Sequence, residues 1–195
     1  MGIEIQDGTG KGYKVAVSED GELQVTAINE SEEHRAAVHG EAYYANTTDT
    51  ANTLTQTATG GAMLYLRNNS STKLLVVEKV LTSSNVAGGT VLWEINKTLG
   101  TIADHNTHVP VNSNASSGRV ADALCYSWAE TNDGLGGLTG GTKIKTFITG
   151  AGFTVHPIDG AIILGKNDSI TVSYTRASAC EFETGIRFYF DSFEG

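Results

Sequence analysis

Residues 163–172 read ILGKNDSITV, and this stretch decides the fold class. An apolar run ends at Leu164, the turn-forming residues Gly165–Asp168 follow, and Ile170 and Val172 then alternate with hydroxyl residues. Gly, Asn and Asp favour tight turns, and a period of two is typical of a β-strand with one buried face. The stretch therefore predicts two strands that a tight turn joins into a hairpin.

The same kind of run recurs along the chain on both sides of this stretch. Apolar or alternating segments bounded by turn residues cover 42–45, 62–67, 73–81, 90–95, 143–148, 161–164, 169–175 and 181–190. With the strands of the N-terminal segment this makes at least nine, and no internal repeat has a fixed period, which argues against a solenoid or propeller. The sequence predicts an all-β domain built as a two-sheet sandwich or a barrel.

Helical periodicity is confined to two places, residues 29–38 and 120–130. In the first, Ser31 is a suitable N-cap for Glu32, and Gly40 is suited to end the helix. The region 96–141 is weakly patterned, and we expect its glycine-rich part, Gly134–Gly141, to be loop.

The first forty residues differ from the rest. Two alternating runs flank Asp20-Gly21, which predicts a β-hairpin ahead of the short helix. A hairpin and one short helix cannot bury their own apolar face, so residues 1–40 are expected to pack on the main domain, 41–195, or on another chain. The apolar residues expected to make these docking contacts are Tyr13, Val15, Val17, Leu23 and Val25.

Composition and charge exclude several classes of partner. The formal net charge is −9, and the 13 basic residues form no cluster, which argues against binding to nucleic acid. No stretch has the roughly 20 apolar residues that span a bilayer, so no membrane partner is expected. Residues 1–10 do not have the pattern of a secretory signal, and we expect synthesis in a cytoplasm.

Residues with catalytic or metal-binding chemistry do not form a recognisable motif. Asp104, His105 and His108 are the only cluster of ligand types, and the spacing of the two histidines suits a helix or turn. No further Cys or His motif joins them, so we expect a polar loop with solvated imidazoles and no metal. The spacing of Gly8–Gly12 does not match a phosphate-binding loop, and no Gly-x-Ser-x-Gly elbow occurs. The sequence predicts a protein without catalysis and without a cofactor.

The cysteines and tryptophans allow four individual predictions. Cys125 and Cys180 are interpreted as buried thiols acting as small apolar groups. Trp93 lies inside an apolar strand and is expected in the core, whereas Trp128 precedes the glycine-rich loop and is the better candidate for an exposed ring. With Tyr126, Trp128 is the candidate contact for a sugar ring.

Two stretches resemble known families. The first comprises GYKVAV (12–17), Asp20-Gly21, LQV (23–25), EEHRAA (32–37) and GEAY (40–43), and it resembles the N-terminal block of tailed-bacteriophage head decoration, cement and minor structural proteins. The second is residues 163–172, which look like the penultimate hairpin of viral and tumour-necrosis-factor-like jelly rolls.

This resemblance implies a jelly-roll β-sandwich preceded by the N-terminal hairpin and short helix. It further implies a homotrimer that is made in the host cytoplasm, contacts the major capsid protein and decorates or cements the exterior of the virion. The alternative is a carbohydrate-binding knob of a head or tail fibre, in which Trp128 and Tyr126 contact a host surface glycan.

Overall fold

The computed structural model describes residues 31–47, 54–56, 60–85, 89–97, 100–103, 105–128, 136–138, 141–175 and 180–192. The chain divides into two compact units, Met1–Ser31 and Glu32–Gly195. The predicted N-terminal hairpin lies outside the described residues, and every helix and strand of the described part belongs to the second unit.

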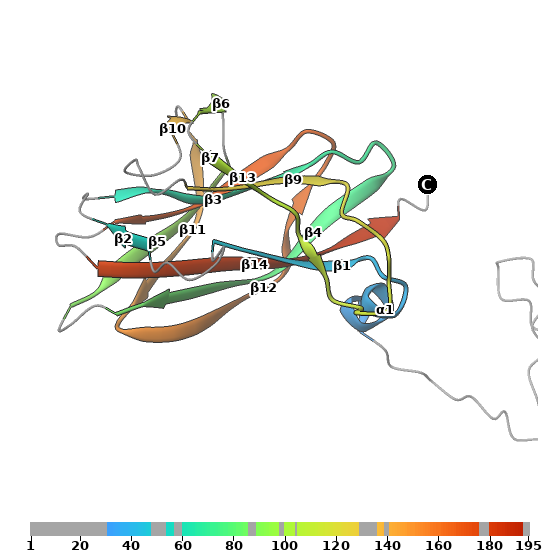
Figure 1. The fold of residues 1–195 in the computed structure, drawn as a ribbon, viewed down its shortest axis with the longest axis horizontal. Coiled ribbons are helices and arrows are strands. Elements are labelled where there is room, and N and C mark those ends of the chain that lie inside the picture. The colour runs from blue at the N-terminus through green and yellow to red at the C-terminus, as the bar shows by residue number, and fades with distance from the viewer. Residues whose placement is uncertain are drawn as a thin grey trace, which may run out of the picture. The chain divides into compact units, whose positions relative to one another are not determined.

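This unit contains one helix and fourteen strands among the described residues (Figure 1). In chain order they are α1 (Glu32–Val38), β1 (Ala42–Asn46), β2 (Leu54–Gln56), β3 (Gly60–Asn68), β4 (Lys73–Ser84), β5 (Val91–Lys97), β6 (Gly100–Ala103), β7 (His105–His108), β8 (Val111–Asn112), β9 (Ala123–Trp128), β10 (Gly136–Leu138), β11 (Thr142–Thr149), β12 (Gly152–Leu164), β13 (Ser169–Thr175) and β14 (Cys180–Ser192).

The long strands form two antiparallel sheets, so the predicted all-β sandwich is confirmed. One sheet has the order β12-β4-β14-β1-β8, with β2 also on β14, and the other has the order β11-β5-β13-β3-β9-β7. Across the two sheets the pairs are nested: β1 with β14, β3 with β13, β4 with β12 and β5 with β11. Eight strands paired from the outside of the chain inward make a jelly roll.

The hairpin predicted for residues 163–172 is wrong, although both of its strands exist. Strand β12 pairs with β4, whereas β13 pairs with β3 and β5 in the other sheet. The tight turn itself is present, because the Asp168 amide donates to the Gly165 carbonyl at 3.1 Å. It carries the chain from one sheet to the other rather than between paired neighbours.

Three further expectations are corrected in the weakly patterned region. Residues 123–128 form strand β9 on the edge side of β3, not a helix. Gly136–Leu138, expected to be loop, pairs with β6 as strand β10. The spacing of His105 and His108 suited a helix or turn, but both lie in strand β7. These strands gain their hydrogen bonds from distant partners, which a local pattern does not reveal.

Helix α1 begins and ends where the sequence predicts. The amides of Gly40 and Glu41 donate to the carbonyls of Ala37 and Ala36 at 3.0 and 2.8 Å, and Gly40 has a φ of 70°. Glycine adopts this left-handed conformation without a steric penalty, so it closes the helix. The helix packs on β14 and β1, where Ala36 lies with Ala42, Val76 and Tyr189.

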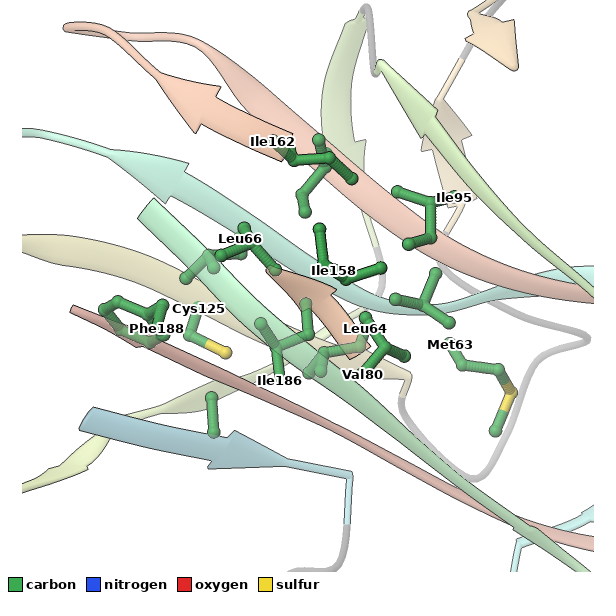
Figure 2. Close-up of a cluster of buried hydrophobic side chains, with 14 of the residues drawn as sticks. Met63, Leu64, Leu66, Val80, Ile95, Cys125, Ile158, Ile162, Ile186 and Phe188 are labelled. Atoms are coloured by element: carbon green, nitrogen blue, oxygen red, sulfur yellow. The ribbon is translucent and has the colours of Figure 1, made fainter. Parts of the chain in front are cut away.

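The main core fills the space between the two sheets. Figure 2 shows side chains from strands of both sheets pointing into this space, among them Leu64 and Ile95 from one sheet and Val80 and Ile186 from the other. Trp93 is fully buried, as predicted, and its ring meets Phe182 edge-on with the centroids 5.6 Å apart.

Candidate functional site

The most unusual surface of the described part is the sandwich edge formed by β11 and β12. These strands are neighbours in the chain and are the outermost strands of their two sheets on the same side. They carry large apolar side chains that water reaches: Ile144, Ile148, Phe153, Val155 and Ile163. Ile148 is 70% exposed and Phe153 is 64% exposed. Large apolar side chains exposed along both edge strands make this edge the candidate contact site.

Their outward direction follows from strand pairing. In β12 the buried residues Ile158, Ile162 and Leu164 face the core, so the intervening side chain of Ile163 faces outward. In β11, Ile148 lies opposite Leu92, next to the pair of Phe147 with the buried Trp93. Successive residues of a strand point to opposite faces, so Ile148 faces away from the core.

The gap between the two edge strands is closed by an aromatic stack. The rings of Phe147 and His156 lie 4.1 Å apart at 20°, and Nε2 of His156 is 2.9 Å from Oγ1 of Thr82. Lys145 places its ammonium 5.7 Å from the Phe147 ring and donates to the Pro157 carbonyl at 3.1 Å. This stack ties β11 to β12 and fixes the geometry of the apolar edge.

Both edge strands are protected against simple strand addition. The register shifts between Lys143 and Lys145 in β11, and again between Pro157 and Ile162 in β12. Asp159 has a φ of 52° inside the second irregularity. Bulges, lysines and proline on an edge prevent another strand from pairing with it. A partner therefore meets this edge through side chains rather than backbone.

We expect acid to weaken the β11–β12 closure through His156. Burial and the nearby Lys145 charge lower the pKa of His156 below 6.5 in the folded protein. The unfolded chain then binds the proton first, so the contribution of His156 to stability is full above pH 6.5 and is lost as pH falls through the folded pKa. Urea midpoints at pH 8 and pH 5 should differ less in His156→Gln than in the unmodified protein, and an equal difference would contradict this role.

A polar cleft of about 810 Å³ lies between α1, Arg119 and the adjoining ends of β4 and β14. Glu41 is central to it, because its Oε1 accepts from Lys73 Nζ at 2.7 Å and also from Arg119. The lining contains three basic side chains, Arg35, Lys73 and Arg119, and three carboxylates. The charges balance, so the arrangement fastens α1 and the following segment to the sheets and has no preference for an anionic ligand.

Helix α1 is also held by charges on the outer face of its sheet. Glu33 pairs with Arg187, whose Nε lies 3.1 Å from Glu78, and Lys79 pairs with Glu78 at 2.5 Å. Burial and the neighbouring Glu33 raise the pKa of Glu78. Tyr189 donates to Glu32 at 3.2 Å, and burial together with that carboxylate raises the pKa of Tyr189 to about 12.

The residues proposed from sequence are a docking set and a pair of glycan contacts. The docking set lies outside the described residues: Tyr13, Val15, Val17, Leu23 and Val25. Tyr126 is half-buried in β9, with its ring stacked on Tyr65 at 5.9 Å. Trp128 ends the same strand, and its side chain lies outside the described part.

Two chemically reactive side chains of the described part, His108 and Cys125, have structural surroundings that account for them. His108 shares a hydrogen bond with Ser127 of the paired strand. Within the described residues no three His, Cys, Asp or Glu side chains gather as metal ligands. Cys125 is a free buried thiol, and burial raises its pKa to about 12, so it packs as a small apolar group. The Cys180 side chain is outside the described part.

The exposed apolar edge was not predicted from the sequence. The strands of β11 and the end of β12 were predicted, but their outward side chains looked like ordinary strand residues. Whether an apolar side chain is covered depends on which strands lie beside it, and that is set by pairing across the chain.

Comparison with protein-family models, with curated proteins and with solved structures finds no match to this chain. The one helix among the described residues is too short to cross a membrane. The strand order and the exposed side chains define the class of this protein as a jelly-roll β-sandwich with an exposed apolar edge.

Proposed function

We propose that this protein is a structural protein of a tailed-bacteriophage virion that decorates or cements the capsid exterior as a homotrimer, without catalysis. The observation that carries the proposal is the apolar edge of β11 and β12, where five large apolar side chains are exposed to water. Exposed apolar side chains of this kind are typical of a protein–protein contact site, which an assembly protein requires.

The sequence supports the capsid as the place of assembly. Residues 12–43 resemble the N-terminal block of phage decoration and cement proteins. The last part of this stretch forms α1 and the start of β1. In the proposed mechanism, residues 1–30 dock on the major capsid protein, and three linked copies bind with an avidity that no single arm reaches. The acidic chain keeps the exposed surface soluble.

Removal of residues 2–30 tests the docking role. We expect the shortened chain to lose recruitment to purified heads that lack this protein, with bound copies measured by quantitative gel densitometry. The deletion stops before α1, because this helix buries Ala36 against Val76 and Tyr189 and belongs to the jelly-roll unit. A longer deletion would damage the sandwich and confuse docking with folding.

Full-length variants provide the matched control. Val15→Ser with Val25→Ser changes the predicted apolar face, and we expect recruitment to fall. Lys14→Ser with Gln24→Ser changes the alternate positions and should leave recruitment unchanged. Undiminished recruitment of the shortened chain would contradict the docking role, and failure of the unmodified protein to bind heads would contradict the proposed function.

A further inference from the structure

Helix α1 has little packing of its own to hold it in place. It has seven residues, and Ala36 is its only buried residue. Isolated helices shorter than about 12 residues are marginal in water, so this one forms because other parts of the chain hold it. On the sheet side, Glu32 accepts from the Tyr189 hydroxyl at 3.2 Å and Glu33 pairs with Arg187. Partly exposed polar contacts contribute little each, so the C-terminal end of the helix must be held as well.

That end is held by a segment we call the strap, residues 112–119, which starts at the end of β8 and runs beside α1 (Figure 1). Asn112 donates from Nδ2 to the Gly40 carbonyl at 2.9 Å, and Asn114 donates from Nδ2 to the Val38 carbonyl at 3.2 Å. The last carbonyls of a helix have no partner within it. The strap therefore caps α1 from a part of the chain 72 positions away.

The strap fits closely against the end of the helix at Gly40. A Cβ added to Gly40 would lie 2.9 Å from the Cβ of Ser117, closer than real side chains approach each other. Directly after this turn, Glu41 pairs with Arg119 at the end of the strap. The absence of a side chain at Gly40 is thus required for the strap to reach the helix.

The strap is held by hydrogen bonds rather than by burial. None of residues 112–119 is buried, and Asn112, Asn114 and Ser117 are half-buried. Asn112 is central, because its Oδ1 accepts from the Asn114 amide at 2.9 Å and its Nδ2 also lies 3.2 Å from the Arg119 carbonyl. Regions with few buried apolar contacts open at a lower free energy than the core of a protein. The strap and α1 together meet that condition.

We propose that the strap is a latch: α1 stays on the jelly roll while the strap is closed, and opening of the strap releases α1 while both sheets remain folded. The main core between the sheets contains no residue of α1 or of the strap, so opening leaves this core intact. Release turns residues 32–41 into a tether that reaches up to roughly 33 Å.

Opening of the latch changes how the preceding chain is attached. Residues 1–31 join the jelly roll through α1, so they start from a fixed helix when the latch is closed and from a tether when it is open. A tether longer than the span between two binding sites lowers the effective concentration of the second site. This consequence rests on the proposed function, in which residues 1–30 dock on the capsid, and it makes the latch a regulator of that docking.

Hydrogen exchange followed by mass spectrometry tests the latch in the full chain. Asn112→Asp keeps the shape of the side chain but replaces the amide donor with a carboxylate that faces the carbonyls of Gly40 and Arg119. Asn112→Ala removes the donor without adding a charge. Ser116→Asp adds the same charge at an exposed position of the strap and is the matched control. Circular dichroism checks that each variant keeps the fold.

In the unmodified protein we expect the amides of His39, Gly40 and Glu41, which donate to carbonyls of α1, to exchange while those of β4 and β14 stay protected. Both Asn112 variants should exchange these amides about tenfold faster, because the strap loses its central hydrogen bonds. Ser116→Asp should match the unmodified protein. Exchange of α1 only together with the strands, equal rates in all four proteins, or loss of the fold in both Asn112 variants would each overturn the latch.

Recruitment to purified heads separates the latch from the proposed function. Faster α1 exchange with no recruitment of the unmodified protein would leave the latch standing and contradict the capsid role. Recruitment with unchanged exchange in the Asn112 variants would leave the capsid role standing and overturn the latch. Where both hold, Asn112→Asp should bind heads in fewer copies than Ser116→Asp at limiting concentration, and equal binding would overturn the regulation of docking.

Discussion

Trp93→Ala should destabilise the jelly roll by about 4 kcal/mol, because it opens a cavity at the centre of the core. The Trp93 side chain is fully buried and contacts the rings of Tyr174 and Phe182, with centroids 6.3 and 5.6 Å away. It also donates from Nε1 to Oγ1 of Thr149 at 3.0 Å, which fastens the end of β11 to β5. Urea unfolding at neutral pH, followed by circular dichroism, measures the loss.

Two variants show which part of the loss comes from packing. Trp93→Phe keeps most of the ring and removes the hydrogen bond, so its cost should be about 1–2 kcal/mol. Thr175→Ala truncates an exposed side chain on the central strand β13, away from the apolar edge, and its cost should stay within about 0.5 kcal/mol. Equal losses for Trp93→Ala and Thr175→Ala would refute the placement of Trp93 in the core.

Asn68→Ala should cost about 3 kcal/mol, since it breaks three hydrogen bonds at once, two of them buried. The fully buried Asn68 side chain donates from Nδ2 to the carbonyls of Lys73 at 2.9 Å and Leu164 at 2.8 Å, and its Oδ1 accepts from the Ser70 amide at 2.8 Å. It therefore joins the β3–β4 turn to the end of β12. Without the amide, buried backbone groups lose their partners.

The neighbouring residue is the matched control for this prediction. Asn69 is half-buried and accepts one hydrogen bond, from Arg67 Nε at 3.0 Å. Asn69→Ala should cost no more than about 1 kcal/mol in the same urea experiment. Similar costs for the two asparagines would show that Asn68 does not connect the two sheets.

Local sequence pattern was sufficient for the features whose physics is local. The alternation in β13 and β14 identifies strands with one buried face. The apolar run in β4 identifies a strand that is buried on both faces. The end of α1 at Gly40 was predictable because a left-handed residue is needed there. The first part of β12 was missed, since Pro157 and the Asp159-Gly160 irregularity break the pattern that marks a strand.

The candidate surface was less predictable than the core. Trp93 is buried in a strand whose apolar character was evident from sequence, and Cys125 is buried as predicted although its strand was not. Ile148 and Phe153 are equally apolar, yet they are exposed because their strands lie at the edge of each sheet. No property of these two side chains distinguishes them from core residues before the strand order is known.

The sequence by itself determined the β class, the short helix with its glycine end, and the presence of a turn at Gly165–Asp168. Each depends on the conformational preferences of a few consecutive residues. The tertiary structure alone decided that this turn crosses between sheets, that β11 and β12 lie at an edge, and that Asn68 bridges residues 96 positions apart. Strand pairing is set by burial summed over the whole chain, and a local pattern specifies the face of a strand but not its neighbour.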